Sequence, residues 1–274
     1  MPLEYHAILN SFNSVAEHYE NNAVLQKEVM ARLLERLEDE KKLNDKFKPE
    51  HILDLGCGTG WAIPELLKLF DNVRISALDF SQNMLNQVPQ SNLVDALLSD
   101  AHDLPFEDSS FDVVFSNMML HWCNEKEVFA ESMRVLKPGG ILIMSALGET
   151  SLVELKHAWL GVDKQSHVHD FPALHNLGDE LFKSRFEDVV VNAEIITLTY
   201  KDVVSLMKDI KASGGQNVNE FRQKGLMPSK KLNLLTEAYE EFRINGRIPA
   251  SYEVVYLRAI KAKLKNNISL AIKD

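Results

Sequence analysis

The sequence of 274 residues is poor in cysteine and has no long run of apolar residues. Its two cysteines, Cys57 and Cys123, are too few for the disulfide framework of a small secreted domain, and their spacing matches no zinc site. We therefore expect two reduced thiols. No apolar stretch approaches the roughly 18 to 20 residues that span a bilayer, and the first residues lack the basic and hydrophobic segments of a signal peptide. These absences predict a cytoplasmic protein that does not contact a membrane.

Positive charge is also scarce, since the formal net charge is −10. Residues 1–150 carry 12 Lys and Arg against 24 Asp and Glu, whereas residues 151–274 carry 18 against 16. Nucleic-acid binding needs a concentrated cationic surface, so we expect no nucleic-acid partner. Residues 203–274 hold 13 basic and 7 acidic side chains. That excess suits an acidic partner or an anionic substrate, and equally an ordinary solvated basic surface.

Strand-like and helix-like segments alternate along the first half of the chain, which predicts an α/β fold with a parallel sheet and crossover helices on both faces. Residues 137–140, Lys-Pro-Gly-Gly, are expected to form a turn before the last of these strands, because Pro and Gly end helices. The predicted strands are 51–56, 73–80, 96–101, 111–120 and 140–147, and the predicted helices are 61–70, 81–88 and 126–136.

Three regions follow from this reading. Residues 1–45 form an N-terminal helical segment, with an amphipathic helix over about 17–43, and residues 46–150 form the core. Residues 151–274 share a strand with the core and otherwise supply a mostly helical lid. Their expected parts are a helix at 151–162, a loop at 167–182, a strand at 189–200, and helical sequence from 202 onward. The helical part is expected to lie over the carboxyl ends of the strands, where open α/β sheets bind ligands.

A glycine loop follows the first predicted strand, with the sequence Asp54-Leu-Gly56-Cys-Gly58-Thr-Gly60. Glycine lets the backbone approach a ligand where a Cβ atom would obstruct it. Asp79 ends the second strand, where a carboxylate can accept both hydroxyls of a ribose. Asp100 ends the third strand and places an acceptor for an adenine amino group near the same crevice. Together these residues predict a nucleoside-containing cofactor.

These motifs, with the segments SDAHDLPF and FDVVFSN, resemble the ordered motifs of class I S-adenosylmethionine-dependent methyltransferases over about residues 50–147. The resemblance implies a Rossmann-like core with S-adenosylmethionine as cofactor. It implies that the glycine loop holds the methionine part, that Asp54 lies near the cofactor's ammonium group, and that Asn117 lies near the methyl group. The implied cofactor-binding residues are Asp54, Gly56, Gly58, Gly60, Asp79, Phe80, Asp100, Ala101 and Asn117.

Five further segments resemble the malonyl-acyl carrier protein O-methyltransferases of biotin synthesis. They are SFNSVAEHYENNAVLQKEV, LHW at 120–122, HVHDFPALHNLGDELF, the pair DIKASGGQN and FRQKGL, and IPASYEVVY. The chain departs from the expected family pattern at His121, where a Gln is expected, and in the turn at residues 212–215. These departures leave room for a related carboxyl methyltransferase that acts on small unsaturated polycarboxylic acids.

The resemblance implies methylation of the free carboxyl of a malonyl thioester, carried on acyl carrier protein or coenzyme A. A carboxylate is already ionised at neutral pH, so its oxygen needs no general base. A cation should orient it, because an unpaired buried anion is costly. Arg243 is our first candidate, followed by Arg222, Lys211 and Arg185. Tyr19 and His121 are candidates to bracket the reacting groups.

Two other functions remain open from the sequence. Methylation of a quinone-type ring would use the same core but a base and an apolar pocket, and a regulatory module would bind the cofactor without turnover. His167, His169 and His175 are metal ligands by residue type alone. We expect no metal, because their segment matches lid sequence and the transfer needs no Lewis acid.

Overall fold

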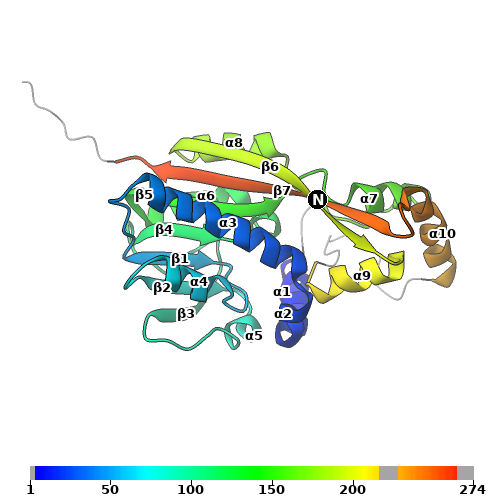
Figure 1. The fold of residues 1–274 in the computed structure, drawn as a ribbon, viewed down its shortest axis with the longest axis horizontal. Helices are drawn as coiled ribbons and strands as arrows, with labels where there is room; N and C mark the ends of the chain where they lie inside the picture. The colour runs from blue at the N-terminus through cyan, green and yellow to red at the C-terminus, as the bar shows by residue number, and fades with distance from the viewer. Residues whose placement is uncertain (1–3, 216–227, 264–274) are drawn as a thin grey trace, which may run out of the picture.

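The computed structural model describes residues 4–215 and 228–263. Its centre is a seven-stranded sheet in the order β3-β2-β1-β4-β5-β7-β6 (Figure 1). Neighbouring strands are parallel except where they pair with β7, which is antiparallel to both β5 and β6. The predicted α/β fold is confirmed. The strands are β1 (His51–Leu55), β2 (Arg74–Asp79), β3 (Val94–Leu98), β4 (Phe111–Ser116), β5 (Leu136–Leu147), β6 (Phe186–Tyr200) and β7 (Ile248–Lys261).

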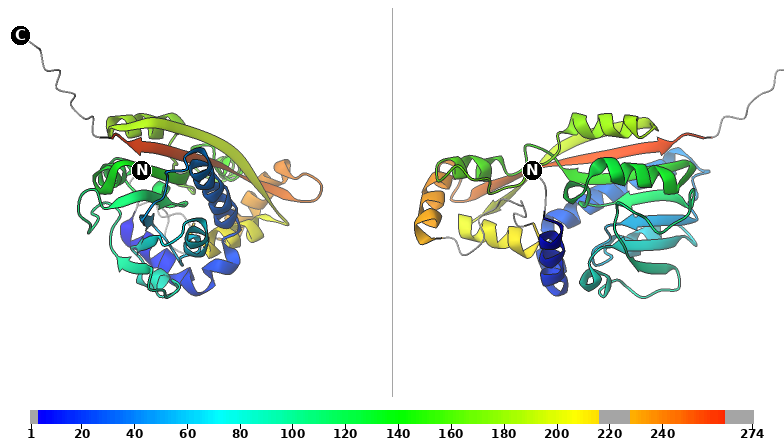
Figure 2. Two further views of the ribbon diagram at one scale, coloured as in Figure 1. Left: turned by 60° about the vertical axis from the view of Figure 1, so that its left-hand side comes forward. Right: turned by 180° about the vertical axis from the view of Figure 1, so that it is seen from behind.

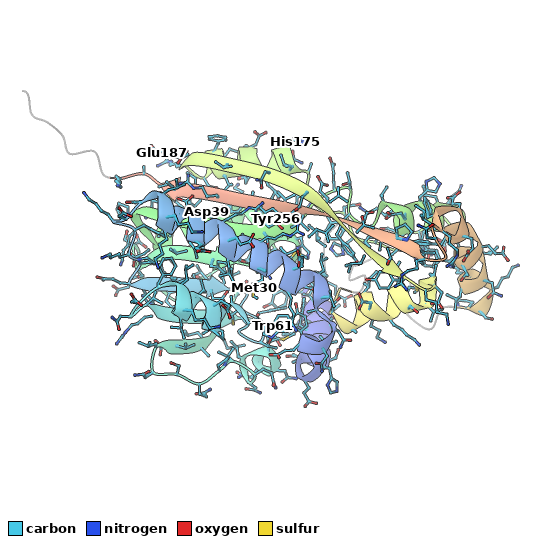
Figure 3. All side chains as sticks on the ribbon, viewed as in Figure 1. Met30, Asp39, Trp61, His175, Glu187 and Tyr256 are labelled. Carbon is cyan, nitrogen blue, oxygen red and sulfur yellow. The ribbon has the colours of Figure 1, made fainter. Side chains whose placement is uncertain are left out.

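Helices cover both faces of the sheet, because the inner strands carry apolar side chains on both sides. On one face, α3 (Val24–Leu43) and α4 (Ala62–Leu69) pack on Ile52 of β1 and its neighbours. On the other, α6 (Glu125–Val135) packs in one apolar cluster with Leu53 and Leu55, and α8 (Leu174–Lys183) packs against β6 and β7. Figure 3 shows Tyr256 of β7 beside α3. Cζ of Arg36, which belongs to α3, lies 3.8 Å from the centroid of the Tyr256 ring.

The predicted turn at residues 137–140 is present as a bulge inside β5. The register of β4 and β5 jumps from Phe111↔Leu136 to Val113↔Ile141, so the residues between lie outside the ladder. Gly139 has a φ of +85°, a conformation that glycine adopts without steric cost. The strand therefore begins directly after α6 and bends at the Pro-Gly-Gly sequence.

β6 and β7 extend as a ribbon beyond the carboxyl end of β5. The pairing of β5 with β7 ends at Leu147↔Val254, whereas β6 and β7 stay paired as far as Tyr200↔Ile248. Three helices surround the protruding end of this ribbon, as Figures 1 and 2 show. They are α7 (Val153–Leu160), α9 (Val203–Ala212) and α10 (Ser229–Tyr239). These helices and the ribbon end form the lid, which lies beyond the carboxyl ends of the core strands.

Two segments of the second half differ from the sequence-based expectation. Residues 248–261, assigned there to the helical remainder, form β7, which pairs with β5 on one side and β6 on the other. Val254, Val255 and Leu257 of β7 are buried in the apolar clusters on the two faces of the sheet. Residues 167–182, expected as a loop, contain most of α8, whose Leu177 and Leu181 are fully buried.

The N-terminal segment contains more helix than expected. Before α3 come α1 (Tyr5–Val15), the 3₁₀ turn η1 (Ala16–His18) and the short α2 (Tyr19–Asn22). The backbone turns at the buried Ala23, with φ −88° and ψ 53°, and this turn separates α2 from α3. The expected single helix over 17–43 is thus broken, and α1 is free to lie across the ends of the core strands. Within residues 4–215 and 228–263, no helix has the length and apolar character needed to cross a membrane.

Candidate active site

The first pocket lies where four parallel strands end. β1, β2, β3 and β4 each contribute residues just beyond their carboxyl ends, the position at which open α/β sheets bind ligands. α1 covers the pocket from outside with Tyr5, Ile8 and Phe12. The strand-end residues that line it are Gly56, Gly58, Asp79, Phe80, Ser99, Asp100, Ala101 and Asn117.

The glycine loop after β1 shapes one wall of this pocket. Gly56 and Gly58 have φ values of +72° and +55°. A Cβ atom on Gly56 would lie 2.4 Å from Cγ of Met119, so no side chain fits there. A Cβ atom on Gly58 would meet nothing nearer than Cε1 of Tyr19 at 4.0 Å. The space above Gly58 is therefore open, and a ligand can approach its backbone closely.

Two buried carboxylates lie beside the loop. Asp79 accepts hydrogen bonds from the backbone N–H of Gly58 at 2.9 Å and of Ser81 at 2.8 Å. Burial nevertheless raises the pKa of Asp79 to about 6. Burial and the charge of Asp79 raise the pKa of Asp54 to about 7, and in the described part of the chain Oδ2 of Asp54 has no hydrogen-bond partner. Two carboxylates that resist joint ionisation favour a cationic ligand at this position.

Two of the predicted cofactor contacts lie behind the pocket wall. Asp54 is 2% exposed and, like Gly60, is absent from the pocket lining. A Cβ atom on Gly60 would lie 3.0 Å from Cδ of Pro89, and its φ is +83°. The turn and its packing therefore explain the glycine at position 60, whereas the role of Asp54 at the pocket stays a prediction.

The opposite side of the first pocket combines an acid with aromatic rings. Burial alone would raise the pKa of Asp100, but hydrogen bonds from the backbone and ring of His102 outweigh it, and this pKa falls below its usual value. Asp100 is therefore ionised and accepts hydrogen bonds. The ring of Phe80 meets those of Tyr5 and Phe12 edge to face, at centroid distances of 5.6 and 6.1 Å. This cluster gives the pocket an apolar surface suited to a flat heterocycle.

A second pocket of about 640 Å³ adjoins the first. Four residues, Phe12, Tyr19, Met118 and Trp122, line both pockets and form their junction. The second pocket lies between the N-terminal helices, the 3₁₀ turn η2 (Leu120–Trp122), α9 and the β6–β7 ribbon. Its other lining residues include Asn22, Gln26, His121, Leu147, His169, Phe171, Leu198, Asp209, Ile210, Ser213 and Tyr252.

Tyr19 and His121, the predicted catalytic residues, both reach this region. Burial and the charge of Asp79 raise the pKa of Tyr19 far above its ordinary value, so its hydroxyl is neutral. His121 lines only the second pocket, and its Nδ1 accepts a 3.4 Å hydrogen bond from the backbone N–H of Leu147. Burial lowers the pKa of His121 well below its ordinary value. Both side chains are thus neutral hydrogen-bond donors at neutral pH.

Comparison with known proteins assigns the chain to a family. Residues 53–144 match a family described as a methyltransferase domain. The chain is 38% identical over 266 residues to the malonyl-[acyl-carrier protein] O-methyltransferase of Gallionella capsiferriformans, which covers 93% of this chain and 90% of that protein. The chain belongs to the malonyl-[acyl-carrier protein] O-methyltransferase family. The relative of the same name from Halorhodospira halophila is 37% identical over 93% of this chain and 87% of its own length.

Other matches agree with membership in the malonyl-[acyl-carrier protein] O-methyltransferase family. The biotin biosynthesis bifunctional protein BioHC of Teredinibacter turnerae is 37% identical over 91% of this chain and 46% of that protein. Among solved structures, the YcgJ protein of Bacillus subtilis has a TM-score of 0.56 at 17% identity, over 85% of this chain and 99% of its own. A phosphoethanolamine N-methyltransferase of Haemonchus contortus, in complex with S-adenosyl-L-methionine, has a TM-score of 0.52 at 18% identity. The match covers 84% of this chain and 52% of that protein. The structural likenesses support the fold alone.

The predicted cations do not converge on the second pocket. Arg243 binds the carboxylate of Glu240, with nitrogen–oxygen distances of 2.5 and 2.6 Å, and lines neither pocket. It also donates to the backbone carbonyls of Lys201 and Gly246. Arg243 therefore links Glu240 to the backbone at the end of the ribbon, and its contact with the substrate stays a prediction.

The other three cations differ in position. Arg185 directly precedes β6, at the end of the ribbon where Phe186 pairs with Lys261, opposite to the pockets. Lys211 is exposed on α9 and lines neither pocket, although its neighbour Ile210 lines the second. Arg222 lies outside the described residues. The places of these loop and lid residues in the fold could not be predicted from their spacing in the sequence, because they depend on how the ribbon projects from the sheet.

Sequence reasoning missed one wall of each pocket. Tyr5, Ile8 and Phe12 of α1 cover the first, and their spacing of three and four residues was a helical signal that could have revealed them. His169 and Asp209 line the second pocket. They belong to two segments that the family resemblance singled out, HVHDFPALHNLGDELF and DIKASGGQN, but the sequence does not show that these segments meet at one pocket.

The three histidines considered as metal ligands have different surroundings. His167 stacks on Trp159 at a centroid distance of 3.4 Å and hydrogen-bonds Asp163 at 2.8 Å. His169 lines the second pocket, and His175 lies exposed on α8, as Figure 3 shows. Within the described ranges, no three His, Cys, Asp or Glu side chains form a group that could hold a metal ion.

Proposed function

We propose that this protein transfers the methyl group of S-adenosylmethionine to the free carboxylate of a malonyl thioester, an early step of biotin synthesis. The observation that carries the proposal is the junction of the two pockets at Phe12, Tyr19, Met118 and Trp122. A methyl donor in the first pocket and an acceptor in the second would meet at these side chains. Family membership supports the acceptor, and the name of the relative BioHC supports the biotin context.

The first pocket fits the proposed cofactor by the chemistry of its residues. S-adenosylmethionine supplies an electrophilic methyl group on a positively charged sulfur and also carries an ammonium group, a ribose and an adenine. We assign the open space above Gly58 to the methionine part, Asp79 to the ribose hydroxyls, and Asp100 with Ala101 to the adenine. The unpartnered oxygen of Asp54 and its raised pKa suit the positive charge.

The remaining assignments concern the wall near the junction. Asn117 donates a 3.0 Å hydrogen bond to the backbone carbonyl of Gln26 and accepts one of 2.9 Å from Ser145. These bonds fix the wall after β4 against α3. Gly56 and Phe80 complete the lining, whereas Gly60 supports the turn from behind. In this proposal residues 46–150 hold the cofactor, and residues 1–45 and 151–274 cover it and shape the acceptor site.

The proposed methyl transfer needs no general base from the protein's side chains. The malonyl carboxylate is ionised at neutral pH, so its oxygen can attack without a base. Tyr19 and His121 would orient the carboxylate by donating hydrogen bonds as neutral groups, and α1 and the lid would exclude water. Alignment of the reacting atoms at about 3 to 3.5 Å would supply most of the rate.

The carrier of the malonyl group would approach over the lid. Lys201, Lys208 and Lys211 are exposed on and beside α9, whose Ile210 lines the second pocket. Such a surface suits an acidic acyl carrier protein, and it suits the phosphates of coenzyme A as well. We propose a cytoplasmic enzyme without a nucleic-acid partner, in keeping with the reduced thiols and the net charge of −10.

The test is S-adenosylhomocysteine formation by the purified protein with malonyl-acyl carrier protein. Acetyl-acyl carrier protein, which lacks a free carboxyl, is the matched control. We expect turnover only with the malonyl form. No turnover despite cofactor binding would overturn the substrate assignment and direct the search to small polycarboxylic acids or quinone precursors. Binding without turnover on any of these acceptors would favour a regulatory module.

A further inference from the structure

The second pocket is polar at two separate places that differ in chemistry. The first, which we call the imidazole end, consists of His121, His169 and Trp122. The ring of Trp122 lies 5.1 Å from that of His121 and 4.8 Å from that of His169, between centroids. Trp122 also lines the first pocket. The imidazole end therefore adjoins the junction at which the methyl group is transferred.

Among the described residues, His169 is a buried side chain with an unsatisfied ring nitrogen. It is 3% exposed, and within the described ranges Nε2 has no hydrogen-bond partner. Buried polar atoms are almost always satisfied, so an unsatisfied one in a pocket wall points to a ligand or water. Burial and the charge of Lys156 lower the pKa of His169 to about 4, so its ring is neutral. In His121, Nδ1 accepts from Leu147 and Nε2 carries the proton.

The second place, which we call the carboxylate end, is Asp209 on α9. The hydroxyl of Tyr200 donates a 2.6 Å hydrogen bond to Oδ2 of Asp209, and within the described residues Oδ1 has no side-chain or backbone donor. Tyr252 and Leu198 of the ribbon line the pocket beside it. Burial and the charge of Asp209 both raise the pKa values of Tyr200 and Tyr252. The carboxylate end is thus an acidic group surrounded by two neutral tyrosine hydroxyls.

The lining carries an anion but, among the described residues, no Lys or Arg side chain. Lys156 lies behind the imidazole end, where Nζ is 5.2 Å from the ring centroid of Phe171 and donates to the carbonyl of Glu149. Its ammonium also lies near Asp170 and Glu253. A substrate carboxylate in this pocket would meet neutral N–H donors at one end and a like charge at the other, and like charges repel.

We infer that the second pocket fixes the direction of the substrate, with the malonyl carboxylate at His121 and His169 and the first amide N–H of the thioester arm at Asp209. This inference rests on the proposed function. A pantetheine arm, which carrier proteins and coenzyme A share, has amide N–H groups a few atoms beyond the sulfur, and a carboxylate is their natural acceptor. The opposite direction would place two carboxylates together and move the reacting oxygen away from the junction.

Kinetics with two malonyl thioesters test this direction. Malonyl-pantetheine carries the amide-bearing arm, whereas the S-ethyl malonyl thioester has the same carboxylate and no amide. Asp209→Asn should raise KM for malonyl-pantetheine about fivefold and leave kcat/KM for the S-ethyl compound unchanged, because the uncharged amide oxygen of Asn is a weaker acceptor than a carboxylate. His169→Phe should lower kcat/KM about 10- to 100-fold on both compounds, because a bond to the reacting carboxylate is lost.

Three controls separate this role from packing. His169→Gln, which keeps an N–H donor, should retain more activity than His169→Phe, whereas a packing role for the ring predicts the reverse order. Tyr200→Phe removes the partner of Asp209 but keeps its charge, and it should not reproduce the selective loss. S-adenosylhomocysteine affinity, measured by calorimetry, should match wild type in all four variants.

Failure of the inference and failure of the proposed function are distinguishable. If the wild-type protein methylates neither malonyl thioester nor malonyl-acyl carrier protein, the proposed function is wrong. If it methylates both thioesters, but Asp209→Asn has the same effect on each, the arm does not lie at Asp209. If His169→Phe is as active as wild type, the carboxylate does not lie at the imidazole end.

Discussion

The backbone N–H of Gly58 donates a 2.9 Å hydrogen bond to the carboxylate of Asp79, and this bond joins the glycine loop to the end of β2. Asp79→Asn should therefore disturb the loop as well as remove the acceptor for the ribose hydroxyls. We expect S-adenosylhomocysteine affinity to fall about 10- to 100-fold, since bonds to charged groups contribute about 1.5 to 3 kcal/mol. Calorimetry gives the affinity, and a melting curve shows whether the variant is folded. An affinity within twofold of wild type would remove Asp79 from the cofactor site.

Cofactor affinity should depend on pH through Asp54 and Asp79. Burial raises their pKa values to about 7 and about 6 in the folded, ligand-free protein, whereas the same groups in an unfolded chain have a pKa near 4. Between about pH 4 and these raised values, the folded protein therefore holds protons that the unfolded chain has lost. These two groups therefore make the ligand-free protein less stable as pH rises from about 4 to 7. A cationic ligand favours the ionised forms, so it should bind more tightly as pH rises through the same window.

Calorimetric titration with S-adenosylmethionine at pH 5.5 and pH 8 measures this effect. We expect affinity to be about tenfold weaker at the lower pH, with proton release on binding. Asp54→Asn, which cannot ionise at that position, should show a smaller difference between the two pH values. Equal affinity at both pH values in the wild-type protein would mean that the two carboxylates do not respond to the cofactor's charge.

The first pocket was largely predictable from the sequence, whereas the second was not. Gly58, Asp79 and Asp100 follow three successive parallel strands, and the carboxyl ends of such strands meet at one edge of a sheet. His169 and Asp209 belong to segments that only the folded chain brings together. β7 was missed for the same reason, since its partners lie roughly 50 to 120 residues earlier in the chain.

Tyr19 should contribute to catalysis as a neutral donor. Its ring lines both pockets, and burial keeps its hydroxyl protonated. Tyr19→Phe should lower kcat/KM for malonyl-acyl carrier protein about 10- to 100-fold, by removing a hydrogen bond to the carboxylate. Steady-state kinetics at several pH values also tests the absence of a base. A rate that rises with pH toward 9 in the wild type, and not in Tyr19→Phe, would instead identify the tyrosine as a base.

Gly214 joins the lid to the N-terminal helix that covers the cofactor pocket. Its carbonyl accepts a 2.9 Å hydrogen bond from Ser11, and its φ is +78°. A Cβ atom there would lie 2.8 Å from Cε1 of Phe12. Gly214→Ala should therefore displace α1, lower the melting temperature, and raise KM for cofactor and substrate together, because Phe12 lines both pockets.

Gly246→Ala is the matched control for this change. Gly246 has nearly the same φ, +77°, but a Cβ atom there would meet nothing within 4 Å. Both substitutions strain the backbone by about 1 kcal/mol, and only Gly214→Ala adds the collision with Phe12. We expect similar small losses in melting temperature from the shared strain, a further loss for Gly214→Ala, and a raised KM for Gly214→Ala alone. Equal kinetic effects of the two variants would show that α1 does not connect the lid to the cofactor pocket.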